Sequence, residues 1–229
     1  MTAGRPEVVV FDVNETLSNL EPLRERFTRV GAPGHLLETW FAATLRDGFA
    51  LTAAGSSATF PEVATGVLRT LLHRQPGLTA GLDEAAQGVL DGFPGLDLHP
   101  DVAEGMRLLA DAGVRMVTLT NGSAALAARL FDGAGLSGLV ERRLSVDDVG
   151  RWKPAPEPYR YAAEQCGVPV DRAAMVAVHP WDLHGAARAG LTTGWISRAG
   201  GPWPAVFDGP DATGADLPAL ARALLALPA

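Results

Sequence analysis

The sequence lacks several features that would place it in familiar classes of protein. It has a single cysteine, Cys166, so it can form neither an intrachain disulfide nor a metal site built from several thiolates. No stretch approaches the roughly 20 apolar residues that a membrane-spanning helix needs. The apolar run near Val8 reaches an acidic residue too soon for a secretory signal. We therefore expect a cytoplasmic protein with no membrane partner.

Basic charge is also scarce in this chain. Lys and Arg number 19 against 26 Asp and Glu, which gives a net charge of -7. Because long nucleic acids are usually bound by a basic face, we expect no nucleic-acid partner. Hydrophobic residues, in contrast, make up 47% of the 229 positions. That is enough for one large domain, or for a core domain with a smaller inserted one.

Short apolar runs bounded by polar residues alternate with helical patterns over most of the chain. The expected buried strands are Val8–Phe11, Arg115–Thr120, Ala174–His179 and Thr192–Ile196. The expected helices of the same region are Asp101–Ala112, Ser123–Ala134, Tyr159–Cys166 and Leu217–Leu227. This alternation indicates an α/β fold with a parallel sheet that is covered on both faces.

The segment from residue 20 to residue 97 has a different character. It contains helix-like stretches at His35–Arg46, Glu62–Leu72 and Leu82–Leu90, and no clear buried strand. We predict that 20–97 forms a helical cap inserted into a Rossmann-like core made of 1–19 and 98–229. Within that core, the Gly- and Pro-rich stretch Ala199–Gly214 is predicted to be a surface loop.

Four polar clusters lie near the ends of predicted strands or in the loops that follow. They are D-V-N-E-T from Asp12, T-N-G from Thr120, K-P from Lys153 and H-P-W-D from His179. In an open parallel sheet, binding sites form outside the carboxyl ends of the strands, so these clusters could converge on one crevice. An aspartate after a strand is, by itself, more often a helix cap or a turn residue. The combination of four clusters is what predicts a site.

Together the clusters resemble the four motifs of the haloacid dehalogenase superfamily. FDVNETL is similar to the first motif, LTNG to the second, RWKP to the third and HPWDLHGAARAG to the fourth, in the same order and with similar spacing. The resemblance implies a Rossmann-like core with a variable cap. It also implies covalent catalysis, in which Asp12 attacks carbon or phosphorus and forms an ester intermediate.

The resemblance implies roles for the other motif residues. Thr16 would bond and orient the Asp12 carboxylate. Lys153 would keep that carboxylate ionised, since a nearby cation favours the charged form. Asp182 would pair with Lys153 or order a water molecule.

A second set of residues is expected to contact the substrate. The hydroxyl, amide and backbone N–H groups of Thr120 and Asn121 are expected to bind the anionic part of the substrate. The full expected set is Val13, Asn14, Trp40, Phe41, Phe60, Thr120, Asn121, Tyr159 and His179. The three cap aromatics in this set could equally form the core of the cap, and Tyr159 could equally pack its own helix.

Two positions argue against a metal-dependent phosphatase. Phosphatases of the superfamily usually place a second aspartate two residues after the nucleophile, but here that position is Asn14, whose amide cannot act as a general acid. In the fourth motif, Val178 stands where an acidic metal ligand is usual, and Mg²⁺ prefers carboxylate oxygens. We therefore expect no metal and no other cofactor.

The remaining pattern resembles the 2-haloacid dehalogenase type II branch. The shared features are T-N-G in the second motif, Lys153 with Tyr159 six residues later, and the Trp-Asp of the fourth motif. This resemblance implies that Asp12 displaces halide from carbon 2 of a short (S)-2-haloalkanoic acid, with inversion, and that water then hydrolyses the ester. Homodimers are common in the branch, so a homodimer is expected.

The chain also departs from that branch. Asn14 stands where a tyrosine is common, and Phe41 follows Trp40 where an arginine is common. Ala177 and His179 replace small polar residues of the fourth motif. Because the expected anion pocket is altered, a small-molecule phosphatase and an inactive binding protein with this fold remain alternatives.

Hydrolysis of the ester benefits from a general base, typically by ~10²–10⁴-fold. His184 lies two residues beyond Asp182, where the loop is expected to enter a helix that carries Gly185–Gly190. Glu21 lies where the chain leaves the first motif for the cap. We predict a Glu21–His184 pair in which the carboxylate raises the basicity of the imidazole. The alternative is that His184 caps a helix while Glu21 is solvated. His179 is a second candidate for the base.

Overall fold

The computed structural model describes residues 4–228. Its sheet has the order β3-β2-β1-β4-β5-β6, and every neighbouring pair is parallel. The strands are β1 (Val8–Phe11), β2 (Arg115–Thr120), β3 (Arg142–Ser145), β4 (Ala173–Ala177), β5 (Thr192–Ile196) and β6 (Ala212–Gly214). The strand order reverses between β1 and β4, which is where open α/β sheets form their binding crevice.

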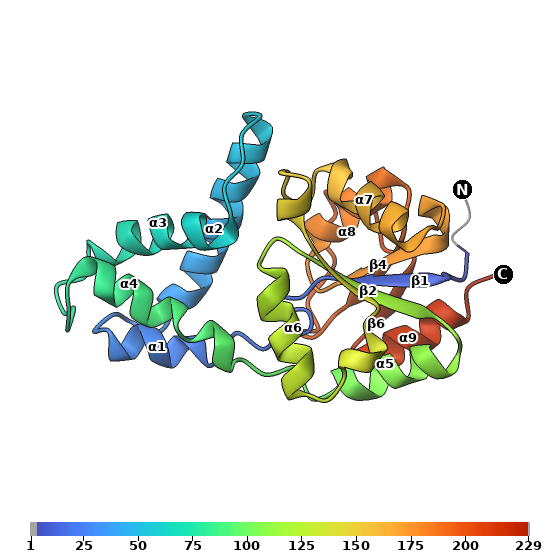
Figure 1. The fold of residues 1–229 in the computed structure, drawn as a ribbon, viewed down its shortest axis with the longest axis horizontal. Helices are drawn as coiled ribbons and strands as arrows, with labels where there is room; N and C mark the ends of the chain where they lie inside the picture. Colours follow the sequence, from blue (N-terminus) through green and yellow to red (C-terminus); the bar gives the residue numbers. More distant parts are fainter. Residues whose placement is uncertain (1–3, 229) are drawn as a thin grey trace.

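Helices cover both faces of this sheet (Figure 1). They are α5 (Val102–Asp111), α6 (Ala124–Gly133), α7 (Pro156–Cys166), α8 (Pro180–Ala189) and α9 (Leu217–Leu225). In β1, Val9 and Phe11 pack in the cluster that contains α5 and α9, whereas Val8 and Val10 pack with α7 and α8. Successive strand side chains point to opposite faces, so a fully apolar strand fits only between two covered faces.

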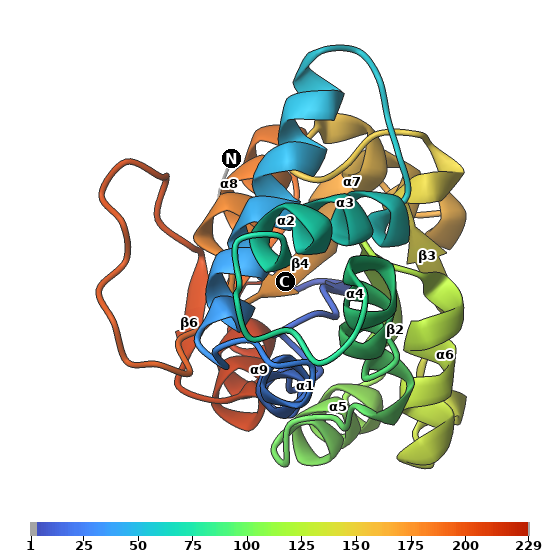
Figure 2. The ribbon, with the colours of Figure 1, turned by 90° about the vertical axis from the view of Figure 1, so that its left-hand side faces the viewer.

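The cap is a group of helices at one end of the core (Figures 1 and 2). They are α1 (Leu23–Arg29), α2 (Leu36–Ala53), α3 (Phe60–Leu72) and α4 (Leu82–Leu90). Trp40 is fully buried among them, and its ring centroid lies 5.9 Å from those of Phe27 and Phe93. The chain leaves and re-enters the core at a bridge between Ser18 and Leu98. We propose that the cap spans residues 20–97, and the position of this bridge supports those boundaries.

The α/β fold class and the four predicted strands are confirmed, but the structure adds two strands and one helix. β3 and β6 lie at the two edges of the sheet, and β6 falls inside the stretch predicted as a loop. β4 ends at Ala177 rather than His179, because α8 begins at Pro180 and the two residues before it form the turn. Helix α1 was not predicted. Within residues 4–228, no helix is long and apolar enough to cross a membrane.

Short 3₁₀ turns complete the described chain. They lie at Phe93–Gly95, Ser137–Leu139, Val146–Asp148 and Val170–Arg172. The long connection between β5 and β6 carries no helix or strand and extends away from the core (Figure 2).

Candidate active site

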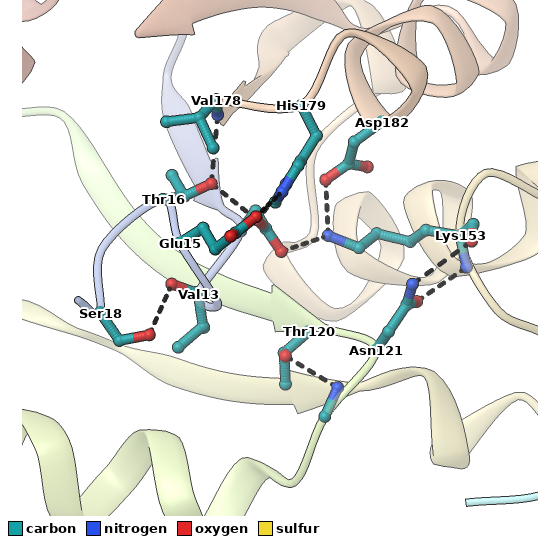
Figure 3. A network of polar contacts seen from close by, with 12 residues as sticks. Val13, Glu15, Thr16, Ser18, Thr120, Asn121, Lys153, Val178, His179 and Asp182 are labelled. Atoms are coloured by element: carbon teal, nitrogen blue, oxygen red, sulfur yellow. Dashed lines mark hydrogen bonds and ion pairs between the residues drawn. The ribbon is translucent and has the colours of Figure 1, made fainter. Parts of the chain in front are cut away.

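Asp12 lies directly after β1 and is almost completely buried. Its Oδ1 accepts a hydrogen bond from Lys153 Nζ at 2.9 Å, and its Oδ2 accepts one from Thr16 Oγ1 at 2.6 Å (Figure 3). The backbone N–H of Val178 donates to Thr16 Oγ1 at 3.1 Å. The hydroxyl oxygen of Thr16 thus accepts one hydrogen bond from Val178, and the hydroxyl proton is donated to Asp12. The carboxylate is therefore held at both oxygens.

Lys153 connects Asp12 to a second buried carboxylate. Its fully buried Nζ lies 2.7 Å from Asp182 Oδ2, and Tyr159 OH donates to Asp182 Oδ1 at 2.6 Å. Buried ion pairs are stable only when further hydrogen bonds replace the lost hydration. Here each carboxylate has such bonds, so a lysine flanked by two aspartates can be accommodated in the interior.

The local charges determine the ionisation states of these groups. Burial by itself raises the pKa of Asp12, but the ammonium of Lys153 and the imidazole of His179 lower it well below the usual range. Burial lowers the pKa of Lys153, but its two carboxylate partners raise it above the ordinary value. Near neutral pH, therefore, Asp12 is a carboxylate and Lys153 is an ammonium ion.

His179 forms a second contact to the nucleophile candidate. Its Nδ1 lies 3.1 Å from Asp12 Oδ2, and its Nε2 lies 2.8 Å from Glu15 Oε2 (Figure 3). The rings of Phe41 and Trp181 pack beside it, with centroids at 6.2 and 5.2 Å. Burial lowers the pKa of His179, yet the hydrogen bonds to two carboxylates raise it to about 9. The imidazole is thus protonated near pH 7 and donates to both acids.

Asn121, from the second motif, binds the backbone of Lys153. Asn121 Oδ1 accepts from the backbone N–H of Lys153 at 3.0 Å, and Asn121 Nδ2 donates to its carbonyl at 3.4 Å. The Asn121 side chain was predicted to bind substrate, but both ends of its amide are engaged by this backbone. Thr120 Oγ1 accepts from the backbone N–H of Gly122 at 2.9 Å and lines the pocket described next.

A mainly apolar pocket opens beside the polar network. It is lined by Val13, Asn14 and Ser18 after β1, by Thr120, Gly122 and Ser123 after β2, by Phe60, Phe93 and Leu96 of the cap, and by Leu126, Ala127 and Leu130 of α6. None of these side chains is charged. The predicted contacts Val13, Asn14, Phe60 and Thr120 thus meet in the lining of one pocket.

The remaining predicted substrate contacts lie elsewhere. Trp40 belongs to the core of the cap, where its Nε1 donates to the carbonyl of Ala64 at 3.0 Å. Phe41 packs against His179 rather than in the pocket wall. Tyr159 is fully buried and donates to Asp182, so it stabilises the ion pair between Asp182 and Lys153.

The predicted Glu21–His184 pair does not form. Glu21 is held instead by the guanidinium of Arg24, with 2.6 Å between Oε1 and Nε. His184 Nδ1 lies 3.4 Å from Asp208 Oδ2, in the loop that precedes β6. The prediction was wrong because α8 begins already at Pro180, so His184 lies a full turn into the helix, beside Asp208 rather than Glu21.

Glu15, the partner of His179, was not among the residues predicted for the site. A glutamate in a turn is usually solvated, and its side chain is indeed 42% exposed. The signal that distinguishes it is conformational. Glu15 has φ of 63° and is the only non-glycine residue with positive φ within residues 4–228.

Trp152 joins the cap to the site. Its Nε1 donates to the carbonyl of Ala58 at 2.9 Å, and its backbone N–H donates to Thr52 Oγ1 at 3.1 Å. Its ring stacks on Phe60 with centroids 6.0 Å apart. Since Lys153 is the next residue, the position of the cap and the position of the buried ammonium are linked.

Comparisons with known proteins agree with the motif-based resemblance. A family model described as haloacid dehalogenase-like hydrolase matches residues 6–190. The (S)-2-haloacid dehalogenase 4A of Burkholderia cepacia is 29% identical over 200 residues, 84% of each chain. A solved L-2-haloacid dehalogenase has a TM-score of 0.87 at 30% identity and covers 96% of this chain and 99% of its own. A plasmid phosphoglycolate phosphatase of Cupriavidus necator is 35% identical over 132 residues, 58% of this chain and 54% of its own.

Proposed function

We propose that this chain, which belongs to the haloacid dehalogenase-like hydrolase family, removes halide from short (S)-2-haloalkanoic acids and yields 2-hydroxy acids. The observation that carries the proposal is the state of Asp12, a buried carboxylate kept ionised by Lys153 and oriented by Thr16. It lies beside a pocket without charged side chains. Similarity to 2-haloacid dehalogenases over most of the chain supports the substrate class.

In the first step, an Asp12 carboxylate oxygen attacks carbon 2 of the substrate. The new C–O bond forms as the carbon–halogen bond breaks, and halide leaves with the bonding electrons. The contacts from Lys153 and Thr16 fix the carboxylate before reaction, which removes much of the orientational cost. Halide needs no proton in order to leave, which is compatible with Asn14 in place of a general acid.

In the second step, water opens the aspartyl ester. Its oxygen adds to Asp12 Cγ, and the bond from Cγ to the ester oxygen breaks to release the 2-hydroxy acid. One proton of the water ends on the product hydroxyl, and the other is lost when the regenerated carboxyl group ionises. Of the two roles expected for Asp182, the proposal takes the pairing with Lys153, since Lys153 and Tyr159 occupy its two carboxylate oxygens.

The proposed reaction uses no metal, and the residues at the site support this. Val178 contributes only its backbone N–H, to Thr16, at the position where a metal-binding acid would stand. In the described part of the chain, no three His, Cys, Asp or Glu residues are grouped so as to hold a metal ion. Mg²⁺ binds mainly through carboxylate oxygens, so the donor set here does not fit it.

The test is halide release from each enantiomer of 2-chloropropionate after exhaustive EDTA treatment. We expect release from the (S) form only, with inversion at carbon 2 and no loss on chelation. Asp12→Asn should keep the fold, shown by an unchanged circular dichroism spectrum, and release no halide. Mg²⁺-dependent hydrolysis of a small phosphate ester without halide release would favour the phosphatase alternative. Equal rates on both enantiomers would contradict the stereochemical part.

Two broader predictions from the sequence accompany this proposal. The partner is expected to be a small carboxylate rather than nucleic acid or membrane, in a cytoplasmic protein. A homodimer is expected from the family resemblance, and light scattering at micromolar concentration would measure it.

A further inference from the structure

We infer that His179 and Glu15 form a charged pair that stabilises the transition state of ester hydrolysis. In this role His179 donates a hydrogen bond to Asp12 Oδ2 while water attacks Cγ, and Glu15 is a positioning residue that holds His179 in its protonated form. The inference rests on the proposed function and adds two residues to it, one of them absent from the motif-based predictions.

The two oxygens of Asp12 have different surroundings. Oδ1 accepts one hydrogen bond, from Lys153, whereas Oδ2 accepts two, from Thr16 and His179. The oxygen with fewer donors keeps more of its lone-pair density, so Oδ1 attacks carbon 2 and becomes the ester oxygen. Oδ2 then remains as the carbonyl oxygen of the ester. Two fixed donors on a carbonyl oxygen are the arrangement that stabilises an oxyanion.

The hydrolytic step moves negative charge onto that oxygen. When the oxygen of water adds to Cγ, the π electrons of the carbonyl bond move to Oδ2. They return as the bond between Cγ and Oδ1 breaks, and Oδ1 leaves with the product and takes one of the two protons of water. The second proton is lost as Asp12 ionises. Charge therefore appears and disappears beside His179, which is in place before the reaction begins.

Glu15 occupies a backbone conformation that is normally left to glycine. At its φ of 63°, a residue with a side chain is strained, and strained positions of this kind concentrate at functional sites. The turn directs the carboxylate to the far nitrogen of His179, at 2.8 Å. The carbonyl of Glu15 is also within 3.1 Å of His99 Nε2, which holds the turn from outside. The strained backbone of Glu15 therefore serves one contact, the one between its carboxylate and His179.

The geometry favours a proton donor over a general base. A base needs a free Nδ1 that can receive a proton from water, but Nδ1 of His179 is in direct contact with Asp12 Oδ2 at 3.1 Å. The uncharged rings of Phe41 and Trp181 flank the imidazole. The donor role requires no movement of the side chain, whereas the base role requires that this contact be replaced by water.

The charges around the imidazole maintain its protonated form. Asp12 and Glu15 face its two nitrogens, while Lys153 lies across Asp12 and Arg198 contacts the backbone carbonyl of Thr16. Once the ester forms, Asp12 is neutral and Glu15 is the carboxylate that remains on His179. The pKa of His179, about 9 in the free enzyme, then falls, and Glu15 limits that fall.

The first test follows the ester of (S)-2-chloropropionate by intact mass in single-turnover experiments. His179→Ala should form the ester and accumulate it, with decay slowed by roughly 10²–10³-fold, as for the loss of one oxyanion donor. His179→Asn places a neutral amide N–H near the position of Nδ1 and cannot act as a base, so it should recover part of the loss. Equal decay rates in wild type and His179→Ala would overturn the inference, and so would an Asn variant no better than the Ala variant.

The second test is the pH dependence of ester decay. If protonated His179 is the active form, the wild-type rate relative to His179→Asn falls as the pH rises through the pKa of His179, with a midpoint below about 9 because Asp12 is then uncharged. Glu15→Gln keeps a hydrogen-bonding group without charge and should move this fall to lower pH. A relative rate that rises with pH would identify His179 as a base and overturn the inference. If no 2-haloacid gives an ester even in the wild type, the proposed function itself fails.

Discussion

The two sides of Asp12 are built from opposite kinds of residue. On one side, Lys153, Asp182 and Tyr159 form a fully buried group of charged and polar atoms joined by bonds of 2.6–2.9 Å. On the other side, the pocket is lined by neutral and mostly apolar side chains such as Phe60 and Leu126. Under the proposed function, fixed charges would position Asp12 for attack, whereas the shape of the pocket would select the substrate.

The neutral pocket also bears on how a carboxylate substrate would bind. Because no cation lines it, the substrate's carboxylate would have hydroxyl, amide and backbone N–H donors, such as those of Asn14, Thr120 and Ser123. Phe41 follows Trp40 where related dehalogenases commonly have an arginine, and the structure places Phe41 against His179 instead. The charge that His179 carries lies close to the nucleophile and not in the pocket wall.

Removing the cation should have the largest effect on the charged side. In Lys153→Met, Asp12 and Asp182 lose the ammonium that lies between them, and a buried charge without its partner costs about 3–5 kcal/mol of unfolding free energy. Urea denaturation at pH 7 measures this loss. The variant should also be inactive.

A matched variant separates loss of the ion pair from loss of side-chain volume. Lys153→Met combined with Asp182→Asn removes one of the two unpaired charges, so part of the lost stability should return. If the single variant unfolds at the same urea concentration as the wild type, the ammonium of Lys153 does not stabilise the two buried carboxylates, contrary to this prediction.

On the neutral side, changing the pocket's shape should alter the selectivity between substrates but not the contacts that hold Asp12. Leu126→Ala enlarges the wall on α6 without touching the polar network. We expect kcat/KM for a 2-haloacid longer by one or two methylenes to rise by roughly 10-fold relative to 2-chloropropionate, the size typical of one methylene in an apolar pocket. The exposed Val206→Ala serves as the control. An unchanged ratio would place the substrate elsewhere.

The smallest expected effect concerns the turn that links the two sides. Glu15→Gly and Glu15→Ala both remove the carboxylate and differ only in a Cβ at a φ of 63°. The Gly variant should be more stable than the Ala variant by about 1 kcal/mol, because the left-handed conformation penalises a Cβ. Paired denaturation curves measure the difference. A more stable Ala variant would show that the turn is not strained.

The sequence predicted the parts of the fold that depend on strong local patterns. Val8–Phe11 is an apolar run between two acidic residues, and Arg115–Thr120 is a largely apolar stretch that begins with an arginine; both are strands with those bounds. The edge strand β3 reads R-R-L-S and has no apolar run, since an edge strand is covered less than a central one. β6 has only three residues, too few for a pattern.

The contacts of the candidate site could be predicted where the residues belong to motifs whose roles the family resemblance implies. Lys153 lies 141 positions from Asp12, yet its motif identified it as the partner of the carboxylate. The Glu21–His184 pair failed because it depended on where α8 begins, and spacing alone does not fix the direction in which a helical side chain points. Glu15 was missed because a left-handed φ in a non-glycine residue leaves no mark in the sequence.

The central claim is that Asp12 acts as a covalent nucleophile, and isotope labelling tests it most directly. Excess enzyme is mixed with (S)-2-chloropropionate in H₂¹⁸O, and the peptide that contains Asp12 is analysed by mass spectrometry together with the 2-hydroxy acid. If water opens an aspartyl ester at Cγ, one ¹⁸O enters Asp12 in the first turnover and the product hydroxyl carries ¹⁶O. Label in the product with none in Asp12 would show that water attacks carbon 2 directly and would contradict the account.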